Sequence, residues 1–430
     1  MKGYVDNKNF DLIDFIKTHD DWEKLLKEKP YNLKSIKNCF WHQDWYMFVY
    51  NLFNSELTNP VVRNCRGTVL SIDGKDVKPI SVPYTKFFGW GDPSGKDMED
   101  AINNWANAKF QLKVDGIILK TACVEQNGEK RLYFFTNGSF DLNVPFEDSM
   151  VFDEPESRGA EFYGDLLEVA LKKLDNSVKI HFDRELGYFY ITGGWSKEIP
   201  FGSTLMFELV SPRNKIICEY KETKLYLHGY RNPELVEEDP RVAIPKLVES
   251  VKFEYPEILD ASNFDDLKKL LEGFNGNEKE GCVVVDYSTP GVPRAKIKCD
   301  SYLKLKFARD TSCNTSVLFK AVVFDEYDDL LAAVPATEPK INEIKENIKK
   351  LYEWFITESL KVAEICVYED PKANKKCWAM WCKKNVSKEL FPWYMLMSGF
   401  DAEIKFDKRL ERLSTSKNGY KKLLELLEAV

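Results

Sequence analysis

A lysine close to an aspartate and a glycine is the first candidate for chemistry in this 430-residue sequence. The segment Lys113-Val114-Asp115-Gly116 lies between the apolar residues Leu112 and Ile117. A lysine amine is a nucleophile once its proton is removed, and it can then form a covalent intermediate. Taken alone, a K-x-D-G segment also fits a turn at the protein surface. Its neighbours along the chain therefore decide what it means.

The common phosphate-binding loops do not occur in the sequence. There is no G-x-x-x-x-G-K-[ST] segment, so a P-loop kinase or ATPase is unsupported, and no G-x-G-x-x-G follows an expected strand. Nucleotide chemistry would have to use another device. Short polar motifs do stand in order around Lys113, namely Cys65-Arg66-Gly67 and residues 84–88 upstream, then Asn137-Gly138, Phe207-Glu208, Glu280-Gly281 and Lys296-Ile297-Lys298 downstream.

This ordered series resembles the covalent nucleotidyltransferases, the group of polynucleotide ligases and RNA-capping enzymes. The Lys113 segment looks like their motif I. The downstream segments resemble motifs III, IIIa, IV and V, in the order Asn137-Gly138, Phe207-Glu208, Glu280-Gly281 and Lys296-Ile297-Lys298.

The closer resemblance is to the T-even bacteriophage RNA ligase 1 family. Residues 65–67 and 83–88 resemble that family's C-R-G and R-P-x-x-K-F-F block, and residues 207–216 resemble its F-E-x-V-x-P-x-N-R-I stretch. Residues 296–302 resemble K-I-K-S-D-x-Y, with Cys299 in place of the serine. The resemblance spans nearly the whole chain. It implies an ATP-dependent RNA ligase that joins 5′-phosphate and 3′-hydroxyl RNA ends, through lysyl-AMP and adenylylated RNA, in RNA or tRNA repair.

One departure from the family pattern lies at Thr136-Asn137. The family carries a lysine there, in a K-S-K-G-S pattern, whereas this chain has Asn137 before Gly138-Ser139. A cation that contacts phosphate is therefore expected to be missing at this position, although Asn137 keeps a place among the candidate nucleotide-binding residues.

The resemblance assigns Lys113 as the nucleophile that attacks the α-phosphorus of ATP. The attacking amine must be neutral, yet the pKa of an unperturbed lysine is near 10.4. Cationic neighbours and partial burial lower such a pKa. The expected cations, which would also stabilise charge in the transition state, are Arg66, Lys86, Lys296 and Lys298.

Two glutamates receive separate roles by resemblance. Glu208 would hold the ribose hydroxyls, and Glu280 would bind Mg²⁺, or Mn²⁺ in its place, through water. Asp115 would either orient the Lys113 ammonium or bind the ribose, and the sequence leaves this open. Gly116 permits the backbone to approach the nucleotide closely.

Three aromatic residues complete the candidate ATP site. Phe88 and Tyr302 are candidates for contact with the nucleobase, although core packing explains them equally well. Tyr50 matches a tyrosine of the family, and simple packing is again the alternative.

Basic and aromatic residues alternate near the C-terminal end, in residues 372–388, with no acidic residue among them. Lysines suit RNA phosphates and tryptophans suit unstacked bases. A helix with tryptophans inward and lysines in water is the alternative. The candidates for RNA contact are Lys375, Lys376, Trp378, Trp381, Lys383 and Lys384, and family analogy suggests a tRNA with a broken anticodon loop as the substrate.

Composition and charge limit the protein class. The apolar fraction of 44% suits a packed core, and the net charge of −8 excludes a generic basic nucleic-acid coat. The ten cysteines form no C-x-x-C, so neither zinc nor disulfides are expected. No signal peptide or membrane span is apparent. We therefore expect a reducing, cytoplasmic location, compatible with a phage- or virus-encoded protein.

The elements that must position these residues change along the chain. Residues 1–60 show helical patterns and then an aromatic stretch, whereas short β-branched runs recur at 68–72, 116–120, 133–135, 204–210, 216–220 and 283–287. Asp73-Gly74, Asn127-Gly128 and Asn137-Gly138 are hairpin dipeptides, and helices are expected at 164–174 and 264–274. Residues 341–355 and 420–427 repeat at helical spacing, after an expected loop at 335–339. The prediction is an α+β adenylyltransferase domain of mostly antiparallel sheets (1–309), resembling an ATP-grasp-like ligase fold, followed by an all-helical domain (310–430).

Two other functions remain open from the sequence. A DNA ligase or an RNA-capping guanylyltransferase would share the motifs, but both usually continue into a small β-barrel where this chain turns helical. A catalytically idle RNA-binding protein is the other alternative, against which the intact lysines and glutamates argue. Without a kinase or phosphatase motif, the healing of RNA ends is expected from a partner in trans.

Overall fold

The computed structural model describes residues 11–39, 41–51, 54–102, 105–146, 154–312, 315–324, 338–365, 379–387, 390–397, 402–416 and 418–429. The chain divides into two compact units, Met1–Leu303 and Lys304–Val430. The division falls inside helix α8 (Asp300–Ser312), a few residues before the predicted boundary at 309/310. Each unit is described by itself below.

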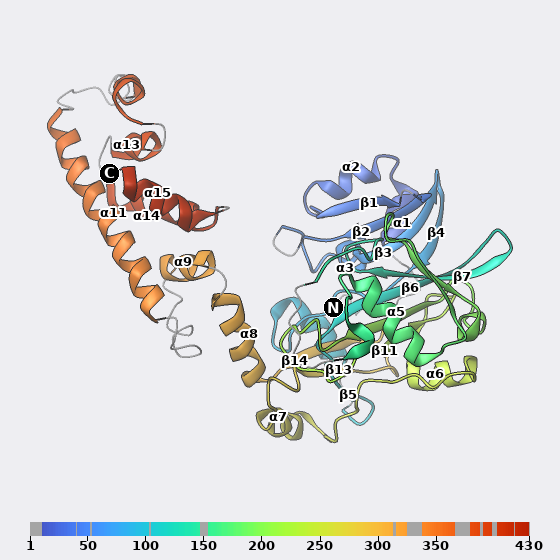
Figure 1. Ribbon diagram of the computed structural model, residues 1–430. Coiled ribbons are helices and arrows are strands. Elements are labelled where there is room, and N and C mark those ends of the chain that lie inside the picture. Colours follow the sequence, from blue (N-terminus) through green and yellow to red (C-terminus); the bar gives the residue numbers. More distant parts are fainter. Residues whose placement is uncertain are drawn as a thin grey trace. The chain divides into compact units, whose positions relative to one another are not determined.

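A four-stranded antiparallel sheet opens the first unit (Figure 1). Its strands follow the chain order β1 (Ser35–Cys39), β2 (His42–Val49), β3 (Arg66–Asp73) and β4 (Asp76–Ser81). Helices α1 (Asp11–Thr18) and α2 (Trp22–Lys27) pack on one face, where Leu12 and Ile16 meet Phe48 and Leu70. Since neighbouring strand residues point to opposite faces, Met47 and Val69 point the other way, toward the second sheet.

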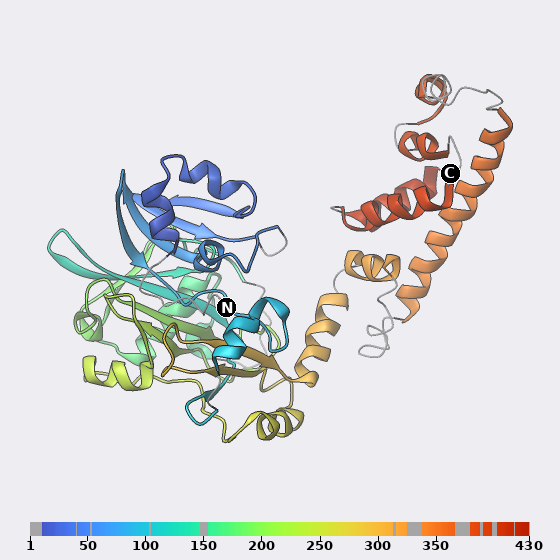
Figure 2. The same cartoon turned by 180° about the vertical axis from the view of Figure 1, so that it is seen from behind.

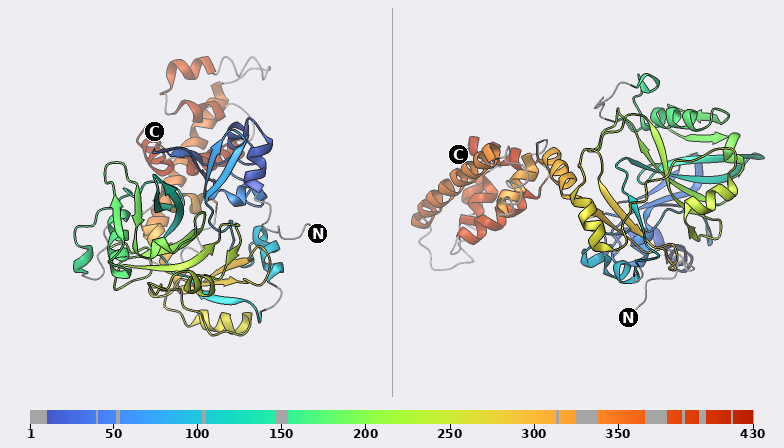
Figure 3. Two further views of the ribbon diagram at one scale, coloured as in Figure 1. Left: turned by 90° about the vertical axis from the view of Figure 1, so that its right-hand side faces the viewer. Right: turned by 90° about the horizontal axis from the view of Figure 1, so that it is seen from below.

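The second sheet has seven strands in the order β12-β11-β10-β6-β7-β9-β8, and its neighbours are antiparallel. The strands are β6 (Ile117–Gln126), β7 (Glu129–Thr136), β8 (Lys179–Phe182), β9 (Phe189–Thr192), β10 (Thr204–Val210), β11 (Lys224–Arg231) and β12 (Glu237–Glu238). One face lies against the four-stranded sheet (Figure 3). Ala122 and Phe135 of this face pack against residues of that sheet. The other face forms the main core with helices α5 (Tyr163–Leu174) and α6 (Pro240–Leu247), through residues such as Leu119, Leu167 and Ile244.

A third antiparallel sheet, β14-β13-β5, holds the segments on which the candidate chemistry depends (Figure 2). Its strands are β5 (Lys109–Leu112), β13 (Gly281–Val285) and β14 (Arg294–Lys298). The remaining helical elements of the unit are α3 (Pro60–Asn64), α4 (Lys96–Ala101), α7 (Phe264–Glu272) and the short 3₁₀ turns η1 (Pro93–Gly95), η2 (Pro155–Ser157) and η3 (Gly194–Lys197). The prediction of an α+β protein with mostly antiparallel sheets is confirmed.

The second unit is helical throughout its described part. Its elements are α9 (Thr315–Val323), α11 (Glu338–Ile365), α13 (Phe391–Met397), α14 (Ala402–Ser414) and α15 (Gly419–Ala429), and residues 379–385 are also helical. Ile341, Ile344, Leu351 and Phe355 repeat along α11 and are all buried in one core, as the helical spacing predicts. Among the described helices, none has the length and apolarity that a membrane crossing requires.

Some predicted elements are wrong. Residues 216–220 form no strand, because Ile217 and Cys218 donate their backbone N–H groups to the Asp115 side chain rather than to a neighbouring strand. Strands β1 and β2 were not expected from residues 1–60. Asn137-Gly138 joins no paired strands, unlike the other two hairpin dipeptides. Pro339 lies in the first turn of α11, where proline is tolerated, while residues 335–337 lie outside the described residues.

Candidate active site

A pocket of about 170 Å³ opens between the sheets of the first unit. Strands β5, β6, β10, β11, β13 and β14 contribute to its walls, as do the first residue of β3 and the segments after β4 and β5. Its lining residues include Arg66, Tyr84, Phe87, Gln111, Lys113, Gly116, Glu208, His228 and Arg294. The pocket thus collects segments that are up to 228 positions apart in the sequence, from 66 to 294.

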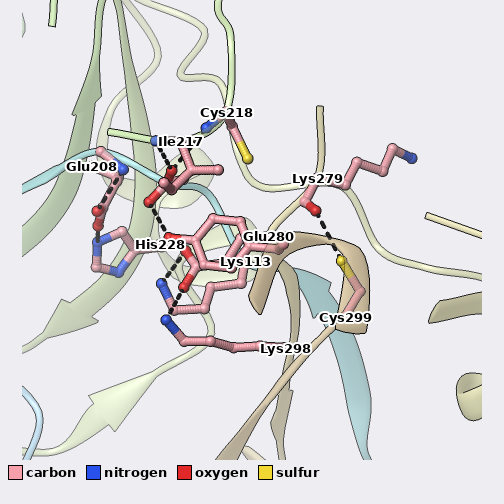
Figure 4. Close-up of polar contacts among 12 residues, drawn as sticks. Lys113, Glu208, Ile217, Cys218, His228, Lys279, Glu280, Lys298 and Cys299 are labelled. Atoms are coloured by element: carbon pink, nitrogen blue, oxygen red, sulfur yellow. Dashed lines mark hydrogen bonds and ion pairs between the residues drawn. The ribbon is translucent and has the colours of Figure 1, made fainter. Parts of the chain in front are cut away.

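Lys113 stands in this pocket directly after β5. Its backbone N–H donates to the carbonyl oxygen of Gly281 at 2.9 Å, which continues the β5–β13 pairing and fixes where the side chain starts. Its Nζ donates to Oε2 of Glu280 at 2.6 Å, and Lys298 Nζ lies 2.7 Å from the other oxygen of the same carboxylate (Figure 4). The Glu280 side chain is 1% exposed, and the two lysines that pair with it, Lys113 and Lys298, both belong to the site.

The pKa of Lys113 contradicts the expectation from the sequence. Burial lowers it, but the carboxylates of Glu280, Glu208 and Asp115 raise it by more, so the pKa lies above the ordinary lysine value. The prediction that the surroundings lower the pKa of Lys113 is therefore wrong for the nucleotide-free protein. The motif residues that define the site include three acids, and their attraction outweighs burial and the nearby cations.

The four predicted cations do lie near one another. The lysine whose pKa they lower is Lys296 and not Lys113. Burial, followed by repulsion from Lys86, Lys113, Lys298 and Arg66, lowers the pKa of Lys296 to about 7. Burial and Arg66 likewise lower the pKa of Lys86, whose ammonium lies 4.8 Å from the centre of the Phe88 ring. The sequence therefore predicted the cluster of cations, but not which lysine has its pKa lowered by that cluster.

Asp115 makes structural contacts that the sequence did not predict. Its Oδ2 accepts hydrogen bonds from the backbone N–H groups of Ile217 and Cys218, both at 2.9 Å, and its Oδ1 accepts one from the Tyr302 hydroxyl at 2.9 Å. Asp115 is 6% exposed, so its carboxylate is buried among these partners. It ties the segment after Lys113 to the loop at 216–220 and to the start of α8.

Glu208 meets the Lys113 segment on β10. Its Oε1 accepts the backbone N–H of Gly116 at 3.2 Å, and its Oε2 lies 3.4 Å from Nε2 of His228. A Cβ at position 116 would stand 2.4 Å from the carbonyl oxygen of Leu209, so only glycine fits this approach of the two chains.

The aromatic residues beside the pocket are not the ones the sequence singled out. Phe88 and Tyr302 are 4% and 2% exposed and belong to the core, and Tyr50 packs at the edge of the core of the four-stranded sheet. Tyr84 and Phe87 line the pocket instead, with the Arg66 guanidinium 4.8 and 5.3 Å from their ring centres.

Sequence reasoning also missed three polar residues of the pocket, Gln111, His228 and Arg294. Arg294 is fully enclosed and pairs with the buried carboxylate of Glu237 on β12. This pairing raises the pKa of the guanidinium above its ordinary value and keeps it charged. No local sequence motif predicts that these residues line the pocket, because the residues that they contact are distant in the sequence.

The residues present fit a magnesium ion of the kind that substrates help to hold. No group of three or more acidic, histidine or cysteine side chains capable of holding a metal exists within the described residues. Mg²⁺ commonly binds through one or two carboxylates, with water and substrate phosphates completing its shell. The buried Glu280 carboxylate beside the nucleophile offers a ligand of this kind.

The predicted RNA contacts lie partly outside the described residues. Lys375, Lys376 and Trp378 belong to that undescribed part. Trp381, Lys383 and Lys384 lie on the helical residues 379–385 and are exposed, Trp381 at 40%, while Cys382 between them is in the core. Trp381 therefore does not follow the alternative of a tryptophan turned into the core.

Comparison with known proteins defines the class. Residues 64–311, more than half of the chain, match a family model described as RNA ligase. The chain therefore belongs to the RNA ligase family, as the resemblance of its motifs predicted.

One relative extends this likeness over more of the chain. A protein of Autographa californica nuclear polyhedrosis virus, named "Putative bifunctional polynucleotide kinase/RNA ligase", is 26% identical over 309 residues. The match covers 70% of the present chain and 39% of the viral protein, so the chain spans well under half of that relative's length.

Proposed function

We propose that the protein is an ATP-dependent RNA ligase in which Lys113 becomes joined to AMP. The first unit is then the adenylyltransferase domain, and the pocket beside Lys113 is the ATP site. The observation that carries this proposal is the placement of the Lys113 amine on Glu280, 2.6 Å away, inside a pocket with a cluster of cations beside it. Membership in the RNA ligase family supports the same reading.

The first step follows from these positions. The Lys113 Nζ forms a bond to the α-phosphorus of ATP, the bond from that phosphorus to the bridging oxygen breaks, and pyrophosphate leaves. The amine gives up its proton to water. Arg66, Lys86 and Lys296 oppose the negative charge of the triphosphate and of the departing pyrophosphate.

The proton on Lys113 is the obstacle to this step, because Glu280 holds the ammonium form. A divalent cation on Glu280 would supply a competing positive charge and weaken that hold. Lys298 stays on the second oxygen of the carboxylate and keeps the side chain in place. Glu208 is then left to bind the ribose hydroxyls.

The two later steps would use the same amine in reverse and then the RNA itself. An oxygen of an RNA 5′-phosphate attacks the AMP phosphorus, the N–P bond breaks, and Lys113 takes back a proton. The 3′-hydroxyl of a second RNA end then attacks the 5′-phosphorus, its proton is released, and AMP leaves. The helical unit, through residues such as Trp381 and Lys383, would select the RNA, with a broken tRNA anticodon loop as the proposed substrate.

We also propose a partner that prepares the ends. The viral relative is named as both a polynucleotide kinase and an RNA ligase, whereas these 430 residues carry no P-loop motif. In this proposal a kinase or phosphatase acting in trans supplies the 5′-phosphate and 3′-hydroxyl.

Incubation with α-labelled ATP and Mg²⁺ tests the lysyl-AMP proposal. We expect a labelled protein band that survives denaturation, that is lost in Lys113→Ala, and that is chased into RNA carrying a 5′-phosphate. Lys109→Ala is the matched control, because this lysine lies on the same strand but pairs with Asp239 at 2.7 Å. Labelling with GTP but not with ATP would indicate a capping enzyme. Sealing of DNA nicks but not of RNA would indicate a DNA ligase, and the absence of any labelling would indicate an idle RNA-binding protein.

A further inference from the structure

Lys120 is a fully buried lysine to which the proposed reaction has given no role. It lies on β6, 0% exposed, and its Nζ donates to the carbonyl oxygen of Thr136 on β7 at 2.6 Å. Within the described residues it forms no ion pair with a carboxylate. A buried amine with a single neutral acceptor is costly to keep, so its position needs an explanation.

The surroundings of Lys120 point toward the nucleotide pocket. Side chains two residues apart on a strand share a face, and Ile118, two residues before Lys120, lines the pocket. The charged neighbour that acts on Lys120 is Arg66, another lining residue of the pocket. Lys120 therefore stands behind Arg66, on the same side of the seven-stranded sheet as the pocket.

Two neighbours of Lys120 each carry a buried side-chain atom that has no hydrogen-bond partner within the described residues. These atoms are Nη1 of Arg66, whose charge acts on Lys120, and Oδ1 of Asn137, the residue that follows β7. The oxygen and nitrogen of an asparagine amide exchange places by a simple flip, so Asn137 can offer either a donor or an acceptor here. A buried arginine nitrogen without a protein acceptor can donate a charge-assisted hydrogen bond to an anion.

Gly67 brings these groups together. Its φ is +79°, and a Cβ there would lie 2.4 Å from the carbonyl oxygen of Asn137 and 2.7 Å from the Lys120 amine. Position 67 therefore needs glycine on two grounds. The absence of a side chain lets the backbone next to Arg66 touch both the lysine and the asparagine.

We propose that Lys120, Arg66 and Asn137 form a phosphate subsite next to the pocket, reached through Arg66, which lines it, and that Lys120 supplies the positive charge which residue 137 lacks. The inference rests on the proposed ligase function. It adds to the expectation that a cation is missing at position 137, since a lysine stands on the opposite strand of the same hairpin. The ligand is a phosphate of the ATP or the 5′-phosphate of the RNA.

The charge state of the lysine agrees with this role. Burial, followed by repulsion from Arg66, lowers the pKa of Lys120 well below the ordinary value. An anion bound to Arg66 reverses the sign of the local field and favours the ammonium form. The subsite is thus prepared for a phosphate and becomes fully charged when the phosphate is bound.

Substitution of Lys120, with and without restoration of charge at position 137, tests the proposal. We expect Lys120→Met to raise the KM for ATP, or for RNA with a 5′-phosphate, about tenfold or more, which is the size of a lost charged hydrogen bond. The maximal rate of labelling should change less. The double variant Lys120→Met/Asn137→Lys should return the KM to within about threefold of the original.

Two further variants separate charge from packing. Lys120→Gln keeps a donor for the Thr136 carbonyl but lacks the charge, and it replaces Lys120→Met if that variant does not fold. Lys130→Met is the matched control, because Lys130 donates to the carbonyls of Lys197 and Ile199 at 2.9 and 2.8 Å, outside the residues that line the pocket. It should leave the KM unchanged.

The two possible sources of phosphate are distinguished by the step that is measured. Self-labelling at increasing ATP concentration reports the triphosphate, and transfer of AMP from pre-labelled protein to RNA reports the 5′-phosphate. An unchanged KM in both measurements, or a double variant no better than Lys120→Met, overturns the subsite while the ligase proposal stands. A wild-type protein that does not label overturns both.

Discussion

The cations in and around the pocket fall into two groups, named below the carboxylate end and the cation end, which treat positive charge in opposite ways. At the carboxylate end, defined by Lys113, Glu280 and Lys298, one buried acid is shared by two ammonium groups. At the cation end, defined by Arg66, Lys86, Lys120 and Lys296, no member forms an ion pair with a carboxylate among the residues described. The pKa of Lys113 is raised at the first end, and those of Lys86, Lys120 and Lys296 are lowered at the second.

The two groups therefore affect the stability of the protein differently. At the carboxylate end each cation pairs with an acid of the protein itself, so this group stabilises the fold and holds the nucleophile in its protonated form. The cation end is unbalanced, so it costs stability until a polyphosphate arrives. Removal of charge at the two ends should therefore change stability in opposite directions, while activity falls in both cases.

The largest effect is expected at the carboxylate end, in Glu280→Gln. The substitution leaves two ammonium groups without their acid and removes the proposed metal ligand. We expect the free energy of unfolding to fall by roughly 3 kcal/mol and self-labelling with ATP to fall by about 100-fold or more. Urea unfolding and the rate of labelling measure the two changes.

Glu257→Gln is the control for this change. Glu257 also pairs with a lysine, Lys279 at 3.2 Å, but it is 57% exposed, so its loss should cost less than about 1 kcal/mol. If Glu280→Gln were as stable and as active as the original protein, the pairing at Glu280 would have neither of the assigned roles.

Lys296→Met is the matching change at the cation end and should have a smaller effect on catalysis. It removes a lysine whose charge is repelled by its neighbours, so the nucleotide-free protein should become more stable, by about 1–2 kcal/mol. The KM for ATP should rise about tenfold. The same unfolding and labelling measurements apply.

The sign of the stability change decides whether the two ends differ. Lys179→Met is the control, because Lys179 is an exposed lysine on β8 and its loss should change the free energy of unfolding by no more than about 0.5 kcal/mol. A Lys296→Met protein that is less stable than the original would mean that the lysine is held by packing and that the cation end is not under electrostatic strain.

Much of this site was predictable because its chemistry is carried by short segments. Lys113, Glu208 and Glu280 stand in motifs whose order the chain preserves, and the structure brings them within contact of one another, directly or through Gly116. The helical spacing of residues 341–355 and the β-branched runs likewise gave the fold class, because periodicity reports which face is buried.

The remainder depends on contacts across the fold. Arg294 enters the pocket through its pairing with Glu237 on another strand, and the carboxyl group of Asp115 is occupied by a loop about 100 positions later. The raised pKa of Lys113 depends on distances to three acids that no spacing in the sequence predicts. A motif identifies a reacting group, whereas its charge state is a property of the assembled pocket.

The smallest of these effects is a dependence of ATP binding on pH. The pKa of Lys296 is about 7 without nucleotide, and a bound triphosphate raises it. Below pH 7 the lysine is already charged, so binding needs no extra proton. As pH rises through 7, binding requires proton uptake, and the KM for ATP should increase with pH until it levels off at no more than the roughly tenfold rise expected for Lys296→Met.

The carboxylate end should respond to pH in the other direction. Lys113 must lose a proton to react and its pKa is raised, so the maximal rate of self-labelling should increase as pH rises, while the KM becomes less favourable. Labelling is measured from about pH 6 to 9 in the original protein and in Lys296→Met. The ionisation of ATP affects both proteins equally, so the comparison between them at each pH removes its contribution. The rise in KM should be much reduced in the variant, whereas the rise in rate should persist. If both were lost together, the two ends would share one titration and their separation would be wrong.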